Sequence, residues 1–233
     1  MANKRILVIS DLHAPYQHPD AIKFLAALKD KYDPDKIICI GDELDFHAMS
    51  FHPSNAELYS AGDEFKAGQE VLWQLEELFP KMTLVESNHG SMAYRKARVT
   101  GIPDSFLIPY KEILDVKHWN WVDRLGLTLP NKQPVFIAHQ ICANARTAMM
   151  SKMMSIIQGH FHEKFEIVYM SNGERLNFGM TVSCLIDDKS MAFHYNKVFP
   201  KRPIMGSAMV IDSQPMLQPM VLKSNGRWNG RVL

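Results

Sequence analysis

Short aliphatic runs alternate with helical patterns through the first half of the chain. Runs at residues 6–9, 37–40 and 82–85 are mostly apolar and end in polar residues, which is typical of strands buried on both faces. The segments between them carry apolar residues at the three- and four-residue spacing of one helix face. This alternation predicts a parallel or mixed sheet covered by helices.

Two helices are expected between these strands. The first begins near Pro19. Its apolar face comprises Ala21, Phe24, Leu25 and Leu28. Ser60 is a suitable N-cap for the second helix, with Asp63 in the first turn. The apolar face of this second helix comprises Phe65, Leu72, Leu75 and Phe79.

The second half of the chain has a different pattern, with strands and tight turns. Apolar runs occur at 135–138, 155–157, 165–170, 175–180, 207–211 and 216–222. Asn172 and Gly173 form a strong hairpin signal between two of these runs, and residues 212–215 predict a second hairpin. We therefore expect an α/β (α+β) fold in which one sheet packs on another, with helices outside.

Composition supports one ordinary globular domain. The chain has 233 residues, of which 46% are hydrophobic and 22% charged. Because no linker, repeat or low-complexity tract interrupts it, residues 1–233 are expected to form a single domain. A net charge of +1 argues against a dedicated nucleic-acid binder but does not exclude a small anionic substrate.

Cysteine usage and the first residues favour a cytoplasmic protein. Cys39, Cys142 and Cys184 are far apart and form no C-x-x-C pair, which predicts buried free thiols in a reducing compartment. The aliphatic run at residues 6–9 is too short for a signal peptide or a membrane span.

Polar residues that bind metals follow five of the apolar runs, within about one to three residues. In chain order these residues are Asp11, His13, Asp42, Asp45, Asn88, His89, His139, His160 and His162. If the strand ends meet at one edge, imidazoles and carboxylates come together without any thiolate. Such a set suits Mn, Fe, Zn or Co. Each motif alone is weak, but five of the ten histidines fall inside the ordered pattern.

The same residues make the chain resemble the calcineurin-like metallophosphoesterases. The ordered blocks of that family are D-x-H, G-D-x-x-D, G-N-H-[DE], a lone His and G-H-x-H. Here they begin at Asp11, Gly41, Ser87, His139 and Gly159 and span about two thirds of the chain, residues 11–162. The resemblance implies four layers, with two mixed β-sheets face to face between α-helices. More loosely, the chain is similar to compact bacteriophage-encoded members, some of which are deoxyribonucleoside-5′-monophosphatases. A viral origin would place it in the host cytoplasm.

The resemblance also implies a site with two divalent metal ions, for which Mn is the first candidate. One metal would be held by Asp11, His13 and His162. The other would be held by Asn88, His139 and His160, with Asp42 bridging both. Cations about 3.5–4 Å apart clamp phosphoryl oxygens and activate a water molecule. His89 would be the general acid and Asp45 would orient it, unless Asp45 is only a carboxylate in the first turn of a helix.

Three departures from the family pattern bear on the substrate. Ser87 and Gly90 replace the usual Gly and acidic residue, which predicts an altered loop with its metal ligand kept. Phe46 stands where the protein Ser/Thr phosphatases carry an Arg that grips phosphate, so protein substrates are disfavoured.

Three residues are candidates to contact the substrate. Arg95 and Arg146 could bind the phosphate, although a solvated surface charge is the simpler interpretation of each. Phe46 could stack on a base, or could pack in the core.

Three functions remain open from the sequence. The leading hypothesis is a phosphomonoesterase acting on a small nucleotide such as a deoxynucleoside 5′-monophosphate. A phosphodiesterase or nuclease could use the same metals, although no dense basic strip is present. A non-catalytic interaction module, as in the retromer subunit with this fold, is less consistent with a complete ligand set. We expect no membrane or stable nucleic-acid partner, and a homo-oligomer is possible.

Overall fold

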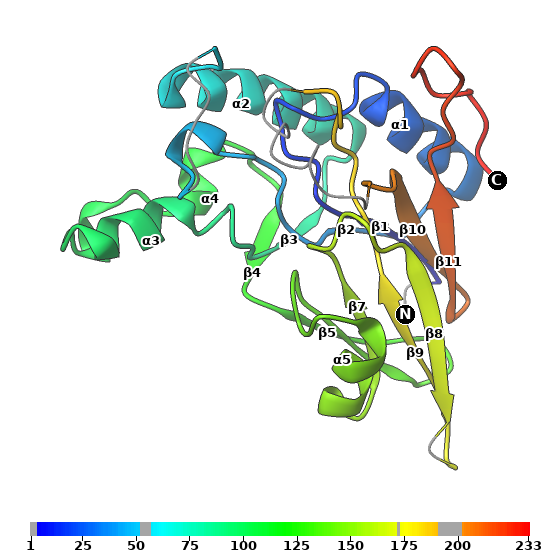
Figure 1. The fold of residues 1–233 in the computed structure, drawn as a ribbon. Coiled ribbons are helices and arrows are strands. Elements are labelled where there is room, and N and C mark those ends of the chain that lie inside the picture. Colours follow the sequence, from blue (N-terminus) through cyan, green and yellow to red (C-terminus); the bar gives the residue numbers. More distant parts are fainter. Residues whose placement is uncertain (1–3, 52–56, 172, 191–201) are drawn as a thin grey trace.

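A computed structural model describes residues 4–51, 57–171, 173–190 and 202–233. Within these residues the strands form two mixed sheets (Figure 1). The first has the order β11-β10-β1-β2-β3-β4 and the second the order β5-β6-β7-β9-β8. Strands of the first sheet are β1 (Arg5–Ile9), β2 (Lys36–Cys39), β3 (Thr83–Val85), β4 (Asn120–Val122), β10 (Gly206–Ile211) and β11 (Gln214–Pro219). Strands of the second are β5 (Leu125–Thr128), β6 (Pro134–Ile137), β7 (Ser155–Gln158), β8 (Glu166–Ser171) and β9 (Leu176–Thr181).

Helices cover the outer face of each sheet. The α-helices are α1 (Ala21–Tyr32), α2 (Ala61–Leu78), α3 (Met92–Val99), α4 (Tyr110–Ile113) and α5 (Ala145–Lys152), and the 3₁₀ turns are η1 (His47–Met49) and η2 (Asp104–Phe106). One buried cluster joins α1 and α2 to the first sheet, and another joins α5 to the second. A third cluster lies between the sheets. The four layers expected from the sequence are therefore confirmed.

Both faces of strand β1 are buried, which explains why its residues are hydrophobic on both faces. Ile6 and Val8 belong to the core between the sheets, whereas Leu7 and Ile9 pack against the helices. Alternation along a strand sends successive side chains to opposite faces, so a run with both faces covered must be apolar throughout. Burial of each such side chain contributes roughly 1.5–3 kcal/mol.

Most predicted elements are present with shifted ends. Helix α1 begins at Ala21, two residues after Pro19. The hydroxyl of Ser60 accepts a hydrogen bond from the Asp63 N–H at 3.2 Å, which confirms the predicted cap. Both hairpins, β8–β9 and β10–β11, are confirmed by their antiparallel pairing, although Asn172 lies outside the described residues. All three cysteines are free; Cys39 and Cys184 are buried and Cys142 is half-buried.

Strands β4 and β5 were not expected. They have three and four residues, too few for a recognisable period, and their pairing partners decide their conformation. Strand β4 pairs parallel with β3, and β5 pairs antiparallel with β6 in the other sheet.

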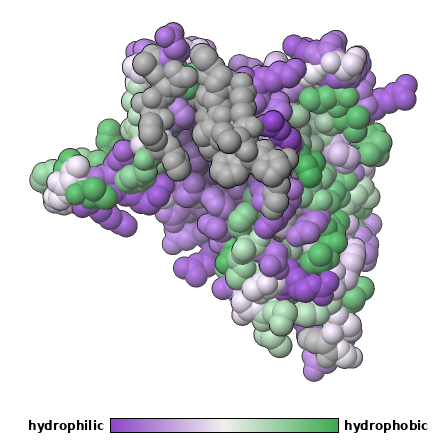
Figure 2. Space-filling view, viewed as in Figure 1, coloured by the Kyte–Doolittle hydropathy of each residue, from purple (hydrophilic) through white to green (hydrophobic). Residues whose placement is uncertain are grey.

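The segment that contains α3, η2 and α4 projects from the sandwich (Figure 1). Figure 2 shows hydrophobic side chains at its outer part. Phe106 and Val99 are 78% and 75% exposed, and Ile108 is also exposed. Within the described ranges, no helix combines the length and apolar character that crossing a bilayer requires.

Candidate metal centre

Asp11, His13 and His162 form the first cluster of possible metal ligands. Asp11 and His13 follow β1 in the first sheet, whereas His162 follows β7 in the second. The Nε2 atoms of the two histidines are 3.2 Å apart, and Oδ1 of Asp11 lies 3.1 Å from Nε2 of His162. Three metal-binding atoms thus face one point between the sheets.

A second cluster lies beside the first and contains Asp42, His139 and His160. Nε2 of His139 lies 3.2 Å from Nδ1 of His160 and 2.7 Å from Oδ1 of Asn88. Asn88 therefore supplies a further oxygen to this cluster. These ligands come from the ends of β2, β3, β6 and β7.

The Asp42 carboxylate lies between the two clusters. Its Oδ2 is 3.6 Å from Nε2 of His13 and 3.2 Å from Nε2 of His139. One oxygen therefore faces a histidine of each cluster, as a bridging ligand would. All seven side chains expected to bind metal are brought together, from two sheets and not from one edge of a single sheet.

Main-chain conformation directs these side chains. Asp11, His13, Asp42 and His160 have positive φ angles of 50°, 51°, 52° and 70°. Residues other than glycine rarely adopt this region, and such strain gathers at functional sites. The two loops are tied together because the N–H groups of Asp11 and His13 donate to the carbonyls of Gly41 and Asp42 at 3.1 and 2.8 Å.

Hydrogen bonds from neighbouring groups orient the ligands. Oδ2 of Asp11 accepts from the Ser10 hydroxyl and from the His160 N–H, which leaves Oδ1 facing the cluster. Nδ1 of His139 donates to the Ile40 carbonyl at 2.9 Å, so that Nε2 is the nitrogen that can bind a metal once it has lost its proton. The Ser87 hydroxyl accepts from the Asp42 N–H at 3.0 Å.

Charges at the centre are strongly coupled. Burial lowers the pKa of His139, but the adjacent Asp42 carboxylate outweighs burial and raises that pKa to about 9. Burial raises the pKa of Asp42, yet the surrounding imidazoles, His139 first, hold it well below its usual range. Burial and the charge of His139 lower the pKa of His160.

The donor set fits two divalent metal ions. In each cluster, imidazole nitrogens and carboxylate oxygens lie within 4.8 Å of one another, close enough for one metal ion to bind them all. Nitrogen and oxygen donors of this kind suit Mn, Fe, Zn or Co.

His89 lies beside the two clusters, forms a third group of possible ligands with His13 and Asp42, and is accessible to solvent. Its Nε2 is 3.9 Å from Oδ2 of Asp42, and its side chain is 20% exposed. Nδ1 is hydrogen-bonded to the main-chain carbonyl of Asp45. The Asp45 carboxylate has a different partner, since its Oδ1 lies 2.5 Å from Nδ1 of His13 and 3.7 Å from Nδ1 of His89. That Asp45 orients His89 stays a prediction: its carbonyl contacts His89 directly, whereas its carboxylate lies nearer the metal-ligand candidate His13.

The three candidate substrate contacts lie in different environments. Phe46 is 9% exposed and its ring centre lies 6.4 Å from that of Phe65 in the helix-side core, which favours the packing alternative; stacking on a base stays a prediction. Arg95 lies near the centre and donates to the Asn88 carbonyl at 2.7 Å. Arg146 is exposed at the start of α5 and does not line the cleft beside the centre.

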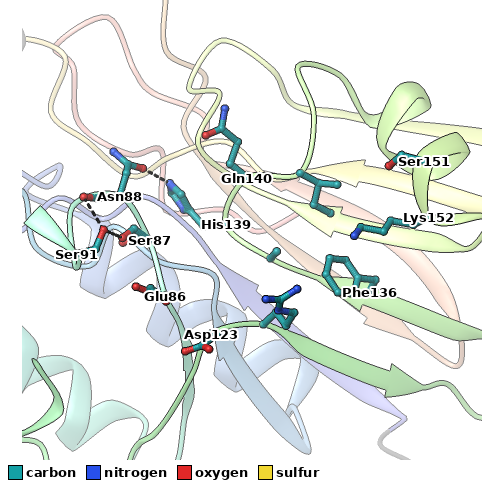
Figure 3. A pocket seen from close by; sticks show the side chains of 13 residues that line it. Glu86, Ser87, Asn88, Ser91, Asp123, Phe136, His139, Gln140, Ser151 and Lys152 are labelled. Atoms are coloured by element: carbon teal, nitrogen blue, oxygen red, sulfur yellow. Dashed lines mark hydrogen bonds between the residues drawn. The ribbon is translucent and has the colours of Figure 1, made fainter. Parts of the chain in front are cut away.

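That cleft has a volume of about 500 Å³ and begins at Asn88 and His139 (Figure 3). It runs along β6 toward the end of α5, where the Lys152 amine lies 4.5 Å from the centre of the Phe136 ring. Glu86, Asp123 and Arg124 also line it. Sequence analysis missed these residues because they come from elements whose proximity no local pattern signals.

Comparisons with known proteins find similar folds. The chain resembles, at a TM-score of 0.50 each, vacuolar protein sorting 29 from Cryptosporidium parvum (14% identity, covering 100% of this chain and 96% of that one) and Vps29 from Chaetomium thermophilum (11% identity, 98% and 94%). A novel archaeal phosphodiesterase matches at 15% identity and a TM-score of 0.49, covering 94% and 99%. At such identities these likenesses concern the fold alone.

A search of curated protein sequences finds no match to this chain. The family model for calcineurin-like phosphoesterase, in contrast, matches residues 4–164, a span that contains all seven candidate ligands. With the match covering more than half of the sequence, the chain belongs to the calcineurin-like phosphoesterase family and is a metal-dependent phosphoesterase.

Proposed function

We propose that the chain is a phosphomonoesterase with two metal ions that acts on a small nucleotide, such as a deoxynucleoside 5′-monophosphate. The observation that carries this proposal is the meeting of seven ligand side chains in two clusters that share Asp42. Manganese is the first candidate metal, because a mixed set of imidazoles and oxygen donors accepts it.

Each cluster has a defined part in this proposal. Asp11, His13 and His162 would hold one ion, and Asn88, His139 and His160 would hold the other, with Asp42 shared. When bound, two divalent cations supply charge stabilisation to a phosphoryl group and lower the pKa of water.

His89 is suited to protonate the leaving oxygen. A main-chain carbonyl can only accept, so the Asp45 carbonyl keeps the proton of His89 on Nδ1. The Nε2 proton can then be given up from the imidazolium, leaving a neutral ring that keeps its hydrogen bond. Proton transfer of this kind contributes typically about 10²–10⁴-fold to rate.

The cleft beside Asn88 and His139 supports a small substrate. Its volume of about 500 Å³ lies within the roughly 300–1,000 Å³ of small-molecule sites. Phe136 offers a half-buried aromatic surface and Gln140 offers amide donor and acceptor groups, so a nucleoside could be held while its phosphate lies at the clusters.

One observation favours a second candidate, a phosphodiesterase or nuclease with the same centre. Arg124 and Lys152 line the cleft away from the ligands and could contact a further phosphate. A diester substrate would then place its second arm along β6.

The test compares nucleoside 5′-monophosphates, cyclic nucleotides and a dinucleotide as substrates of the Mn²⁺-loaded protein. We expect monophosphates to be hydrolysed and His89→Ala to reduce kcat by about 10²–10⁴-fold with Mn²⁺ affinity kept. His118→Ala is the matched control, because His118 is exposed beside the opposite ends of the strands.

Three outcomes contradict parts of the proposal. Hydrolysis of diesters alone replaces it with the second candidate. Wild-type turnover by His89→Ala removes the acid assignment. No hydrolysis of any ester with metal bound favours the interaction module.

The bacteriophage origin, the single domain, the cytoplasmic location and the absence of a nucleic-acid partner stay predictions, and an oligomer remains possible.

A further inference from the structure

Tyr110 contacts two loops of the metal centre, although no motif block contains it. It belongs to α4 in the projecting segment and is 4% exposed. Its hydroxyl donates a hydrogen bond to Oε1 of Glu43, which is 1% exposed and directly follows Asp42. One buried hydrogen bond therefore joins α4 to the loop that carries the shared carboxylate.

The ring of Tyr110 also contacts the loop that carries His89. A Cβ atom at Gly90 would lie 3.1 Å from Cε1 and 3.4 Å from Cζ of Tyr110, so the ring packs closely against this glycine and would have to shift to accept a larger residue. Tyr110 thus contacts the Asp42 loop through its hydroxyl and the His89 loop through its ring.

The surroundings hold the ring in place. Its centre lies 6.2 Å from that of Phe46 and 6.1 Å from that of Trp121. Its main-chain N–H donates to the Tyr94 hydroxyl at 3.1 Å. Because the ring is packed against the core and also contacts both loops, it links the position of each loop to the core.

These loops meet where the chemistry would occur. The His89 N–H donates to Oδ1 of Asp42 at 3.1 Å, and Nε2 of His89 lies 3.9 Å from Oδ2. A shift of about 1 Å between reacting groups can lower a rate by about 10²-fold. The spacing of these two loops therefore matters for the chemistry, and a group that contacts both loops can influence it.

We propose that Tyr110, through its hydrogen bond to Glu43, is a positioning residue that sets the distance between Asp42 and His89. The inference rests on the proposed function, because proton donation by His89 depends on the distance that Tyr110 would set. It gives a role to Gly90 as well, because the absence of a side chain there admits the tyrosine ring.

The test is a double-mutant cycle with Tyr110→Phe, Glu43→Gln and the pair. Tyr110→Phe keeps the ring and removes only the hydroxyl. We expect it to lower kcat about tenfold with KM changed less than about threefold, and the pair to be no slower than the slower single variant. Tyr32→Phe is the control, since its hydroxyl donates to the Leu233 carbonyl away from the site.

A measurement without turnover separates this inference from the proposed function. In the metal-free protein, the Cε1–H resonance of His89, assigned with His89→Ala, should shift in Tyr110→Phe, while that of His118 should not. If this resonance and kcat both stay as in the wild type, the inference is overturned even when thermal stability falls. If the resonance shifts but no ester is ever cleaved, the positioning role stands and the proposed function fails.

Discussion

At the residue scale, three imidazoles of the centre differ in which ring nitrogen faces the other ligands. His139 donates from Nδ1 to the Ile40 carbonyl and His13 contacts the Asp45 carboxylate through Nδ1, so both direct Nε2 inward. His160 directs Nδ1 instead. Partners of this kind fix the tautomer and hold the ring before a metal arrives.

Asp45→Asn is expected to weaken metal binding more than it affects proton transfer. The carboxylate lies 2.5 Å from Nδ1 of His13, and loss of such a partner typically lowers metal affinity by about 10–100-fold. Titration calorimetry with Mn²⁺ measures the effect, with Asp63→Asn on α2 as the control. Unchanged affinity with a reduced kcat would instead support the role of Asp45 in orienting His89.

Metal binding at pH 7 is expected to release protons. Although burial lowers the pKa of His139, Asp42 raises it to about 9, so the metal-free imidazole is charged at pH 7 and must lose its proton to bind a metal. Because this proton competes with the metal, metal affinity should increase as the pH rises toward 9. Calorimetry in buffers of different ionisation enthalpy counts the protons. Zero release, with an affinity that does not change between pH 6 and 9, would contradict this.

The identity of the ligands could be predicted from the sequence because each directly follows a strand. The partner of Asp45 could not, since it depends on how two loops fold over one another. Phe46 shows the same limit, because its backbone has a positive φ and its ring packs in the helix-side core. Spacing along the chain carries no information about such a conformation.

At the element scale, the loops that follow the strands are held by close contacts between backbones. Gly41 lies at the start of the loop that follows β2 and has a φ of 103°, and a Cβ atom there would lie 2.4 Å from Cβ of Ser87. Only glycine avoids both the strain and the collision. The loop that carries Asp42 can therefore pass against the loop that carries Asn88.

Gly41→Ala is expected to destabilise the fold and weaken Mn²⁺ binding, because the loops of β2 and β3 must separate. Gly62→Ala is the matched control: it lies in α2 with no atom within 4 Å of a new Cβ, and should stabilise by about 0.5–1 kcal/mol. Urea unfolding of the metal-free proteins gives both values. Equal stability of the two variants would show that the loops can separate without cost.

Long periodic elements were predictable and short paired ones were not. Helices α1 and α2 bury the residues that their spacing selected, Phe65 being only partly covered. Strands β4 and β5 form because β3 and β6 offer them unpaired backbone groups. The cleft next to the centre depends on these unpredicted parts, since Asp123 and Arg124 lie between β4 and β5.

At the scale of the whole molecule, the ligands come from both sheets. Asp11, Asp42 and Asn88 follow strands of the first sheet, whereas His139 and His160 follow strands of the second. A metal that binds this set binds the assembled sandwich and has no equivalent site in the unfolded chain. Binding is therefore coupled to folding.

Mn²⁺ is expected to raise the melting temperature in a concentration-dependent way. At a free concentration of about 100 times Kd, one site adds about 2.7 kcal/mol. Differential scanning fluorimetry across a Mn²⁺ series, with EDTA as the reference, measures the shift. His139→Ala should abolish most of it, and an equal shift in that variant would mean that the metal binds elsewhere.

The chain passes from one sheet to the other at the exposed turn of Asp123 and Arg124, and this turn separates the candidate ligands along the sequence into two groups. Cutting there would leave Asp11, His13, Asp42 and Asn88 on one fragment and three histidines on the other. Neither fragment alone would hold all the ligands for two metal ions. Split at this turn, the polypeptide would become a two-piece system whose reassembly is driven by metal and reversed by a chelator.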